Sequence, residues 1–149
     1  MDVTRVDEIV LQHMEESARI VPILQDVQRH YRYLPEEVLR HVAGRLRIPC
    51  SRVYSVANFY GAFSLTPRGK HLIRVCMGTA CHLRGSPKLM DLLASKFKVG
   101  DGGTSSDGMF SVEAVNCLGA CALAPVVAVD GKYFDEVSPD KLLRIIKQF

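Results

Sequence analysis

Four of the five cysteines in this 149-residue chain stand in two closely spaced pairs. Cys76 and Cys81 lie in "VCMGTACHLRG", and Cys117 and Cys121 lie in "NCLGACALAP". Each pair begins just past an apolar run, "LIRV" or "VEAV", that is typical of a buried strand. Two neighbouring strands would deliver all four thiols to one end of a sheet. The pairs therefore constrain the fold more strongly than any other feature of the sequence.

The cellular compartment of the chain determines whether these thiols are expected to be reduced or to form disulfides. The first residues, "MDVTRVDEIVLQHMEES", carry acids where a signal peptide carries bases, and no stretch has the roughly 18 unbroken apolar residues of a membrane helix. We therefore expect a cytoplasmic chain without membrane insertion. Thiols stay reduced there, which favours metal binding or redox catalysis over disulfides. The net charge of +3 is spread among interleaved acids and bases, so nucleic-acid binding is not expected.

Spacing and neighbours both bear on which metal four thiolates would hold. Structural zinc sites usually use Cys-x(2–4)-Cys, whereas plant-type 2Fe-2S sites include Cys-x4-Cys, the separation of Cys76 and Cys81. An anionic cluster also needs backbone N–H groups close to sulfur, and small residues within both pairs permit that approach: Gly78, Thr79, Ala80, Gly119 and Ala120. These features favour iron over zinc. A zinc-stabilised interaction module using the same cysteines is the alternative.

A metal-free thiol oxidoreductase is disfavoured, because thioredoxin-type catalysis uses Cys-x-x-Cys and neither pair has that spacing. Four further residues are candidates of lesser weight. Cys50 is interpreted as a small, partly buried hydrophobe, and His82 is not expected to be a ligand because four cysteines complete the set. Arg84 and Lys88 are candidates for offsetting the negative charge of a cluster.

The spacing of apolar residues divides the chain into two parts. Between residues 4 and 60 the spacing is helical, which predicts an N-terminal domain of about four helices over residues 1–64. Pro22 and Pro35 suit helix starts, and Ser51 is the expected cap of the fourth helix. The segment 61–70, with two glycines and a proline, is the expected boundary.

The second part, residues 70–149, is predicted to be an α/β domain. Its expected elements are strand 71–76, helix 86–97, strands 109–116, 126–130 and 132–136, and helix 138–149. The loop "GDGGTSSDG" does not match the dinucleotide pattern Gly-x-Gly-x-x-Gly, because Ser105 stands where the third glycine is required. We therefore expect this chain not to carry the nicotinamide or flavin chemistry itself.

Two runs of the sequence resemble a known family. They are "VYSVANFYGAFSLTPRGKHLIRVCMGTACHLRG" and "DGMFSVEAVNCLGACALAPVVAVDGKYF", with Cys-x4-Cys, then Cys-x3-Cys within "CLGAC", then Ala-Pro. The resemblance is to the thioredoxin-like 2Fe-2S subunit family, which includes the small flavoprotein-partner subunit of respiratory complex I. Corresponding subunits occur in NAD(P)-dependent soluble hydrogenases and formate dehydrogenases. With the preceding helical segment, the resemblance covers nearly the whole chain.

The resemblance implies an α/β, thioredoxin-like 2Fe-2S domain preceded by a small all-α segment. It implies that Cys76, Cys81, Cys117 and Cys121 bind one cluster. It also implies an electron-transfer subunit of a multi-subunit NAD(P)-linked oxidoreductase, of hydrogenase, formate dehydrogenase or NADH dehydrogenase type. The loop "GTACHLRG" is most similar to soluble hydrogenases, whether or not these bifurcate electrons.

Chemistry and resemblance agree on the partner. A cluster moves one electron at a time and a nicotinamide moves a hydride, so a flavin must stand between them in another chain. The resemblance implies a larger iron-sulfur subunit that binds FMN and NAD(P), together with further catalytic subunits. The helical part, residues 1–62, is expected either to dock onto that subunit or simply to close as a small bundle.

Overall fold

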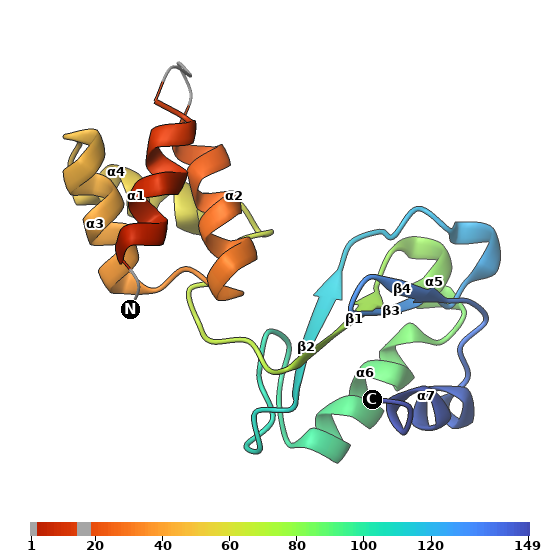
Figure 1. Cartoon of the computed structure of the whole chain (residues 1–149). Helices are drawn as coiled ribbons and strands as arrows, with labels where there is room; N and C mark the ends of the chain where they lie inside the picture. The colour runs from red at the N-terminus through yellow and green to blue at the C-terminus, as the bar shows by residue number, and fades with distance from the viewer. Residues whose placement is uncertain (1–2, 15–18) are drawn as a thin grey trace. The chain divides into compact units, whose positions relative to one another are not determined.

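The computed structural model describes residues 3–14 and 19–149 and separates the chain into two compact units, Met1–Pro67 and Arg68–Phe149 (Figure 1). The first unit is entirely helical in its described part. Its four helices are α1 (Val3–Gln12), α2 (Ile20–Tyr31), α3 (Glu36–Leu46) and α4 (Cys50–Phe59). Their apolar stripes close on a shared core that contains Val6, Ile9, Ile23, Leu24, Val27, Leu39, Val42 and Val53.

Prolines mark the starts of the third and fourth helices. Pro35 is the N-cap of α3, and the first turn contains Glu36 and Glu37, whose charges suit a helix N-terminus. Pro49 has the same role in α4, because its extended backbone ends the preceding loop and lets the helix begin at Cys50. The prediction that Ser51 caps α4 is therefore wrong: Ser51 lies inside the helix, where its carbonyl accepts a hydrogen bond from the Ser55 hydroxyl at 2.7 Å.

The second unit is built on a four-stranded sheet. Its strands are β1 (His71–Cys76), β2 (Phe110–Val115), β3 (Val127–Val129) and β4 (Lys132–Phe134), in the order β2-β1-β3-β4. Helices α6 (Ser86–Phe97) and α7 (Pro139–Ile146) pack side by side on one face (Figure 1). They bury a core that includes Ile73, Val75, Leu89, Leu93, Val112, Val127, Leu142 and Ile145.

The pairing of β1 with β2 positions the cysteines. These two strands are parallel and in register from His71↔Phe110 to Cys76↔Val115, whereas β1–β3 and β3–β4 are antiparallel. Parallel neighbours finish at the same edge of a sheet, and here each is followed within two residues by a cysteine-containing loop. The prediction that neighbouring strands deliver both pairs to one end of the sheet is confirmed.

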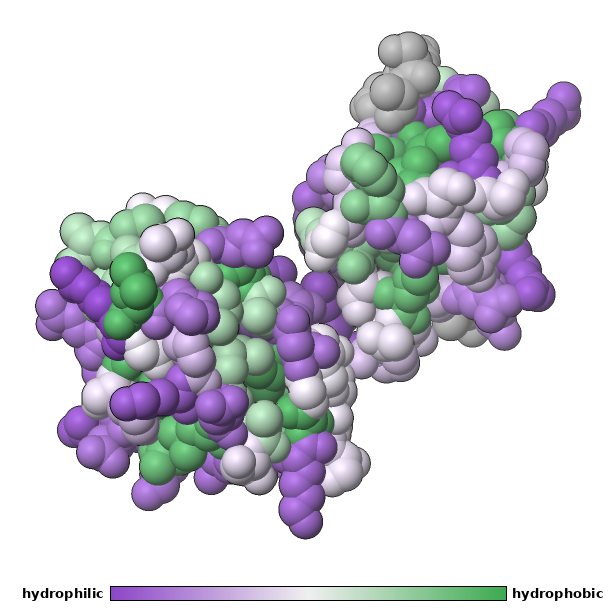
Figure 2. All heavy atoms as spheres, turned by 180° about the vertical axis from the view of Figure 1, so that it is seen from behind, coloured by the Kyte–Doolittle hydropathy of each residue, from purple (hydrophilic) through white to green (hydrophobic). Residues whose placement is uncertain are grey.

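Hydrophilic and hydrophobic residues are intermixed over the surface of each unit in the view of Figure 2. The helices of residues 3–14 and 19–149 are all too short or too polar to cross a membrane.

Candidate metal centre

Each of the four paired cysteines lies in a short regular element or close to the end of one. Cys76 is the last residue of β1, and Cys81 lies in the one-turn helix α5 (Thr79–Leu83). Cys117 follows the end of β2, and Cys121 begins the short 3-10 helix η1 (Cys121–Leu123). Helices α5 and η1 are in contact, so both loops lie over the same end of the sheet.

The four thiols differ in exposure. Cys76 and Cys81 are each only 2% exposed and pack with Ala124 and Val126 in a small apolar cluster of their own. Cys117 and Cys121 are exposed. Since one pair lines the interior and the other faces solvent, a group held between them would have one protected side and one open side.

Backbone N–H groups converge on the sulfur atoms. Gly119 donates to Cys117 Sγ at 3.2 Å. Burial works to raise the pKa of the Cys76 thiol, but hydrogen bonds from the backbone of Gly78 and Leu118 and from the neighbouring thiols outweigh it and lower that pKa. A lowered pKa favours the thiolate, which is the form that binds metals. The sequence predicts that the backbone at Gly78 and Gly119 approaches sulfur, because glycine leaves room for it. It does not predict the Leu118 donor, because the type of a side chain does not indicate the direction of its backbone N–H.

The pKa values of the Cys81 and Cys121 thiols are raised above the ordinary value of a cysteine. Burial, together with the nearby Cys76 and Cys121 sulfurs, raises the pKa of the Cys81 thiol, although the backbone of Val126 opposes this. The hydrogen bond and charge of Cys117 raise the pKa of the Cys121 thiol. Neighbouring sulfurs thus contribute to the shifted pKa values of Cys76, Cys81 and Cys121, and bound metal would stabilise such a donor set as thiolates.

Two glycines shape the site for different physical reasons. A methyl group at Gly78 would lie 2.6 Å from the carbonyl oxygen of Asn116 and 3.6 Å from Cys76 Sγ, so only glycine fits between the two loops. Gly119 has open space around it but a φ of +82°, which side chains disfavour. The backbone thus approaches sulfur as predicted, but for two reasons. At Gly78 there is no room for a side chain, and at Gly119 the backbone adopts a conformation that side chains disfavour.

The donor set fits a thiolate-bound iron site in three respects. The Sγ atoms of Cys117 and Cys121 are 3.9 Å apart, close to the roughly 3.8 Å between two thiolates on one tetrahedral metal with bonds of about 2.3 Å. N–H donors reach the sulfurs, and the ligand types are those of clusters rather than of hard cations. Within residues 3–14 and 19–149, no three His, Cys, Asp or Glu side chains are placed to hold a single ion.

The lesser candidates occupy different places. Cys50 is half-buried against the core of the helical unit, as predicted for a small hydrophobe. His82 is exposed on α5, beside the buried Cys81. Arg84 reaches across to the loop after η1, where its Nη1 lies 3.4 Å from the carbonyl oxygen of Ala124. Lys88 is exposed on α6. Of the two basic candidates, Arg84 has a contact that joins the two cysteine loops.

Comparison with known proteins identifies relatives that match nearly the whole chain. A family model described as "Thioredoxin-like [2Fe-2S] ferredoxin" matches residues 6–149. The chain is 36% identical over 135 residues to the NADP-reducing hydrogenase subunit HndA of Solidesulfovibrio fructosivorans, which covers 91% of this chain and 79% of that protein. It is 38% identical over 143 residues to a subunit of the NADH-quinone oxidoreductase of Rickettsia bellii, covering 94% of this chain and 86% of that one.

A solved structure has the same fold. It is that of an NAD+-reducing [NiFe]-hydrogenase in the air-oxidized state, with a TM-score of 0.71 and 20% identity. The match covers 84% of this chain and 22% of the hydrogenase chain. The present fold therefore also occurs as one part of a longer polypeptide.

Proposed function

Because the chain belongs to the thioredoxin-like [2Fe-2S] ferredoxin family, we propose that it is the electron-transfer subunit of an NAD(P)-linked oxidoreductase complex. Relatives that cover most of the chain are subunits of an NADP-reducing hydrogenase and of NADH-quinone oxidoreductases, which supports this role. The observation that carries the proposal is the convergence of two cysteine pairs, one buried and one exposed, at the shared end of β1 and β2.

In this proposal Cys76, Cys81, Cys117 and Cys121 hold the cluster as thiolates. When bound, a [2Fe-2S] cluster supplies one-electron oxidation and reduction. The backbone donors at Gly78 and Leu118 and the Gly119 N–H stabilise negative charge on sulfur. The buried pair keeps water from one side, and the exposed pair leaves a short route for electrons to a partner.

The finer proposal is that the partner is an FMN-containing, NAD(P)-binding subunit of a soluble hydrogenase. The loop "GTACHLRG" and the similarity to HndA support the hydrogenase type. The glycine-rich segment of residues 100–108 supports placing the nucleotide elsewhere, because polar side chains in it already accept hydrogen bonds from the backbone around the start of β2. Ser105 Oγ accepts from the Phe110 N–H at 2.9 Å, and Asp107 Oδ1 accepts from the Met109 N–H at 2.9 Å.

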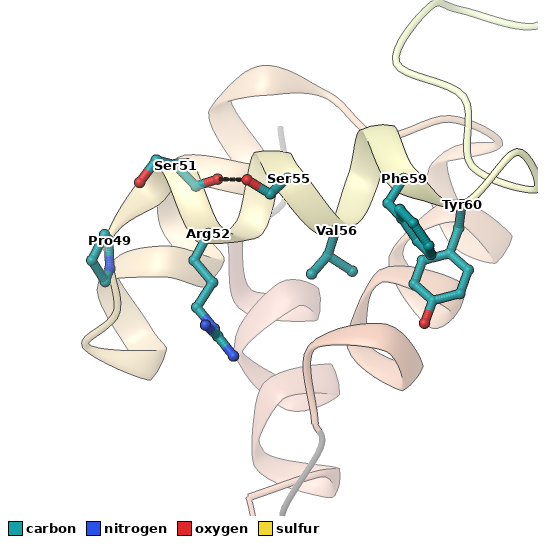
Figure 3. A pocket seen from close by; sticks show the side chains of 7 residues that line it. All are labelled: Pro49, Ser51, Arg52, Ser55, Val56, Phe59 and Tyr60. Atoms are coloured by element: carbon teal, nitrogen blue, oxygen red, sulfur yellow. Dashed lines mark hydrogen bonds between the residues drawn. The ribbon is translucent and has the colours of Figure 1, made fainter.

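We also propose that the helical unit contributes to docking. A surface hollow of about 660 Å³ runs along α4, lined by Pro49, Ser51, Arg52, Ser55, Val56, Phe59 and Tyr60. In Figure 3 the side chains of Arg52, Val56, Phe59 and Tyr60 project toward the same side of the helix. Phe59 is 80% exposed, so a partner that covers this hollow removes a large aromatic surface from water.

The first experiment tests the cofactor and its ligands. We expect the anaerobically purified chain to be brown, to contain about two irons and two sulfides, and to give an EPR signal only on reduction. Replacing any one of Cys76, Cys81, Cys117 or Cys121 with serine should lower the iron content. Cys50→Ser is the matched control and should not change it. A colourless protein with stoichiometric zinc would instead support the interaction module.

The second experiment tests the division of labour between subunits. The isolated chain should neither bind NAD(P)H in calorimetry nor be reduced by it, because a hydride cannot be accepted without a flavin. Addition of the FMN-containing partner should permit reduction, with dithionite as the positive control. Reduction by NAD(P)H with flavin rigorously absent would show that the chemistry resides in this chain.

The third experiment tests the α4 hollow. Phe59→Ser should weaken association with the partner in calorimetry without changing iron content. Leu11→Ser, at a leucine on α1 that is 60% exposed, is the matched control and should bind normally. Equal affinities for both variants would leave the helical unit as a structural bundle without a docking role on α4.

A further inference from the structure

Two exposed leucines flank the metal centre in the same way. Leu83 is the last residue of α5, two positions after Cys81, and Leu123 is the last residue of η1, two positions after Cys121. Leu83 is 81% exposed and Leu123 is 47% exposed. Each short helix that provides a thiol therefore also presents a leucine to solvent.

These leucines are not scattered surface residues. In residues 68–149, all of which the structure describes, the exposed large hydrophobic residues are Leu83, Leu123 and Tyr133. Two of the three thus lie on the elements that carry cysteines, whereas Tyr133 lies on β4. Single exposed leucines need no explanation, but such a pairing beside a site indicates an interaction surface.

The two leucines are also held in place relative to the thiols. Helices α5 and η1 are in contact, and Arg84, next to Leu83, reaches the Ala124 carbonyl beyond Leu123. Ala80, Leu118 and Ala120 pack against the buried cluster of Cys76 and Cys81 beneath them. A surface fixed in this way loses little conformational entropy when a partner binds to it.

We infer that Leu83 and Leu123 form the apolar docking surface for the redox partner, which is the flavin-containing subunit of the proposed complex. This inference rests on the proposed function. Electrons must pass through the exposed Cys117 and Cys121 side of the centre, so the partner must approach that side. Leu123 lies two residues from the exposed Cys121 on η1, and α5, which carries Leu83, is in contact with η1. We therefore expect a partner that covers those thiols to reach both leucines and to exclude water from the contact.

Polar and charged residues border Leu83 and Leu123. Because both signs of charge are present among them, this surface does not favour a strongly charged partner. Arg84 and His82 lie on the α5 side, and Glu136, whose N–H donates to the Leu123 carbonyl at 2.8 Å, lies on the other. We therefore expect a partner face that is mainly apolar at its centre, with polar groups of both signs at its rim.

The test compares leucine-to-glutamine variants of the full chain. Leu83→Gln and Leu123→Gln keep side-chain size, and because both sites are exposed, folding and iron content should not change. Each should weaken binding to the flavin subunit about tenfold or more in calorimetry, and should slow reduction of the cluster in stopped flow. Leu11→Gln on α1 is the matched control and should leave both quantities unchanged.

The outcomes separate this inference from the function on which it rests. If the wild-type chain lacks a cluster or does not bind the flavin subunit, the proposed function fails. If the wild-type chain binds and both glutamine variants bind equally well, the docking surface is wrong while the function stands. If light scattering shows that the leucines instead hold two copies of this chain together, and the variants are monomers with normal partner affinity, the inference is also overturned.

Discussion

The contact between Gly78 and Asn116 gives a sharp prediction for Gly78→Ala. The new methyl carbon would lie 2.6 Å from the Asn116 carbonyl oxygen, whereas carbon and oxygen rarely approach closer than about 3.0 Å. The neighbouring backbone cannot yield easily. The Met77 N–H donates to the Val115 carbonyl at 2.7 Å, and the Cys76 N–H donates to the Val126 carbonyl at 3.1 Å. The two cysteine loops must therefore move apart.

Overpacking of this kind costs about 1–3 kcal/mol of unfolding free energy. With a slope near 1 kcal/mol per molar urea, the midpoint for the sheet unit should fall by about 1 M or more. Anaerobic urea titration monitored by the visible absorbance of the cluster measures this directly. Hydrogen exchange of β1 and β2 in the metal-free chain provides a readout that does not depend on the cluster.

Gly100→Ala is the matched control, because Gly100 lies in the same unit, has no neighbouring atom within 4 Å of the new carbon, and does not have a positive φ. It should leave the midpoint and the exchange rates close to those of the wild-type chain. Gly78→Ala with wild-type stability and wild-type cluster retention would refute the reasoning from contact distance. Equal destabilisation by both alanines would refute it as well.

Three further predictions concern single residues. Gly119→Ala should cost roughly 1–2 kcal/mol through its positive φ, and Gly119→Asn should cost less, as measured by cluster retention during urea titration. Ser138 caps α7, because its Oγ accepts a hydrogen bond from the Lys141 N–H at 3.2 Å. Ser138→Ala should therefore lower the free energy of unfolding by about 1 kcal/mol. Ser51→Ala, which removes no cap, should change it by less than about 0.5 kcal/mol. The hydrogen bond from His41 lowers the pKa of Asp7 in the folded chain. The ionised Asp7 carboxylate therefore stabilises the fold fully above the ordinary carboxyl pKa, and this stabilisation is lost as pH falls through the lowered pKa of the folded state. The Tm difference between wild type and Asp7→Asn should thus shrink between pH 7 and pH 3; a constant difference would contradict this.

The regular elements were largely predictable because their apolar spacing is unambiguous. Helix α6 has the predicted bounds, Ser86–Phe97, since its leucines recur on one face and Gly85 precedes it. The thioredoxin-like fold and the [2Fe-2S] family, which the resemblance of two sequence runs to that family implied, are likewise confirmed. Ser51 was mistaken for a cap because serine is a common N-cap, while the fixed φ of Pro49 had already started the helix.

The interior of the site was less predictable. Helices α5 and η1 span only five and three residues, so no periodic apolar signal is available to reveal them. The difference in burial between Cys81 and Cys117 also has no local signal, because it depends on which loop lies against Ala124 and Val126. Spacing can therefore identify the thiols, but only the packed loops show which of them face solvent.

The parallel pairing of β1 and β2 has a consequence for biosynthesis. Within residues 68–149, all of them described, the apolar core between the sheet and helices α6 and α7 contains none of the four cysteines. The sheet can therefore close before iron arrives, yet Cys76 cannot meet Cys117 until β2 has left the ribosome and joined β1. We expect cluster loading to be a late maturation step on a folded chain. A carrier protein would reach the outward-facing Cys117 and Cys121 first, with the inner pair completing coordination from beneath.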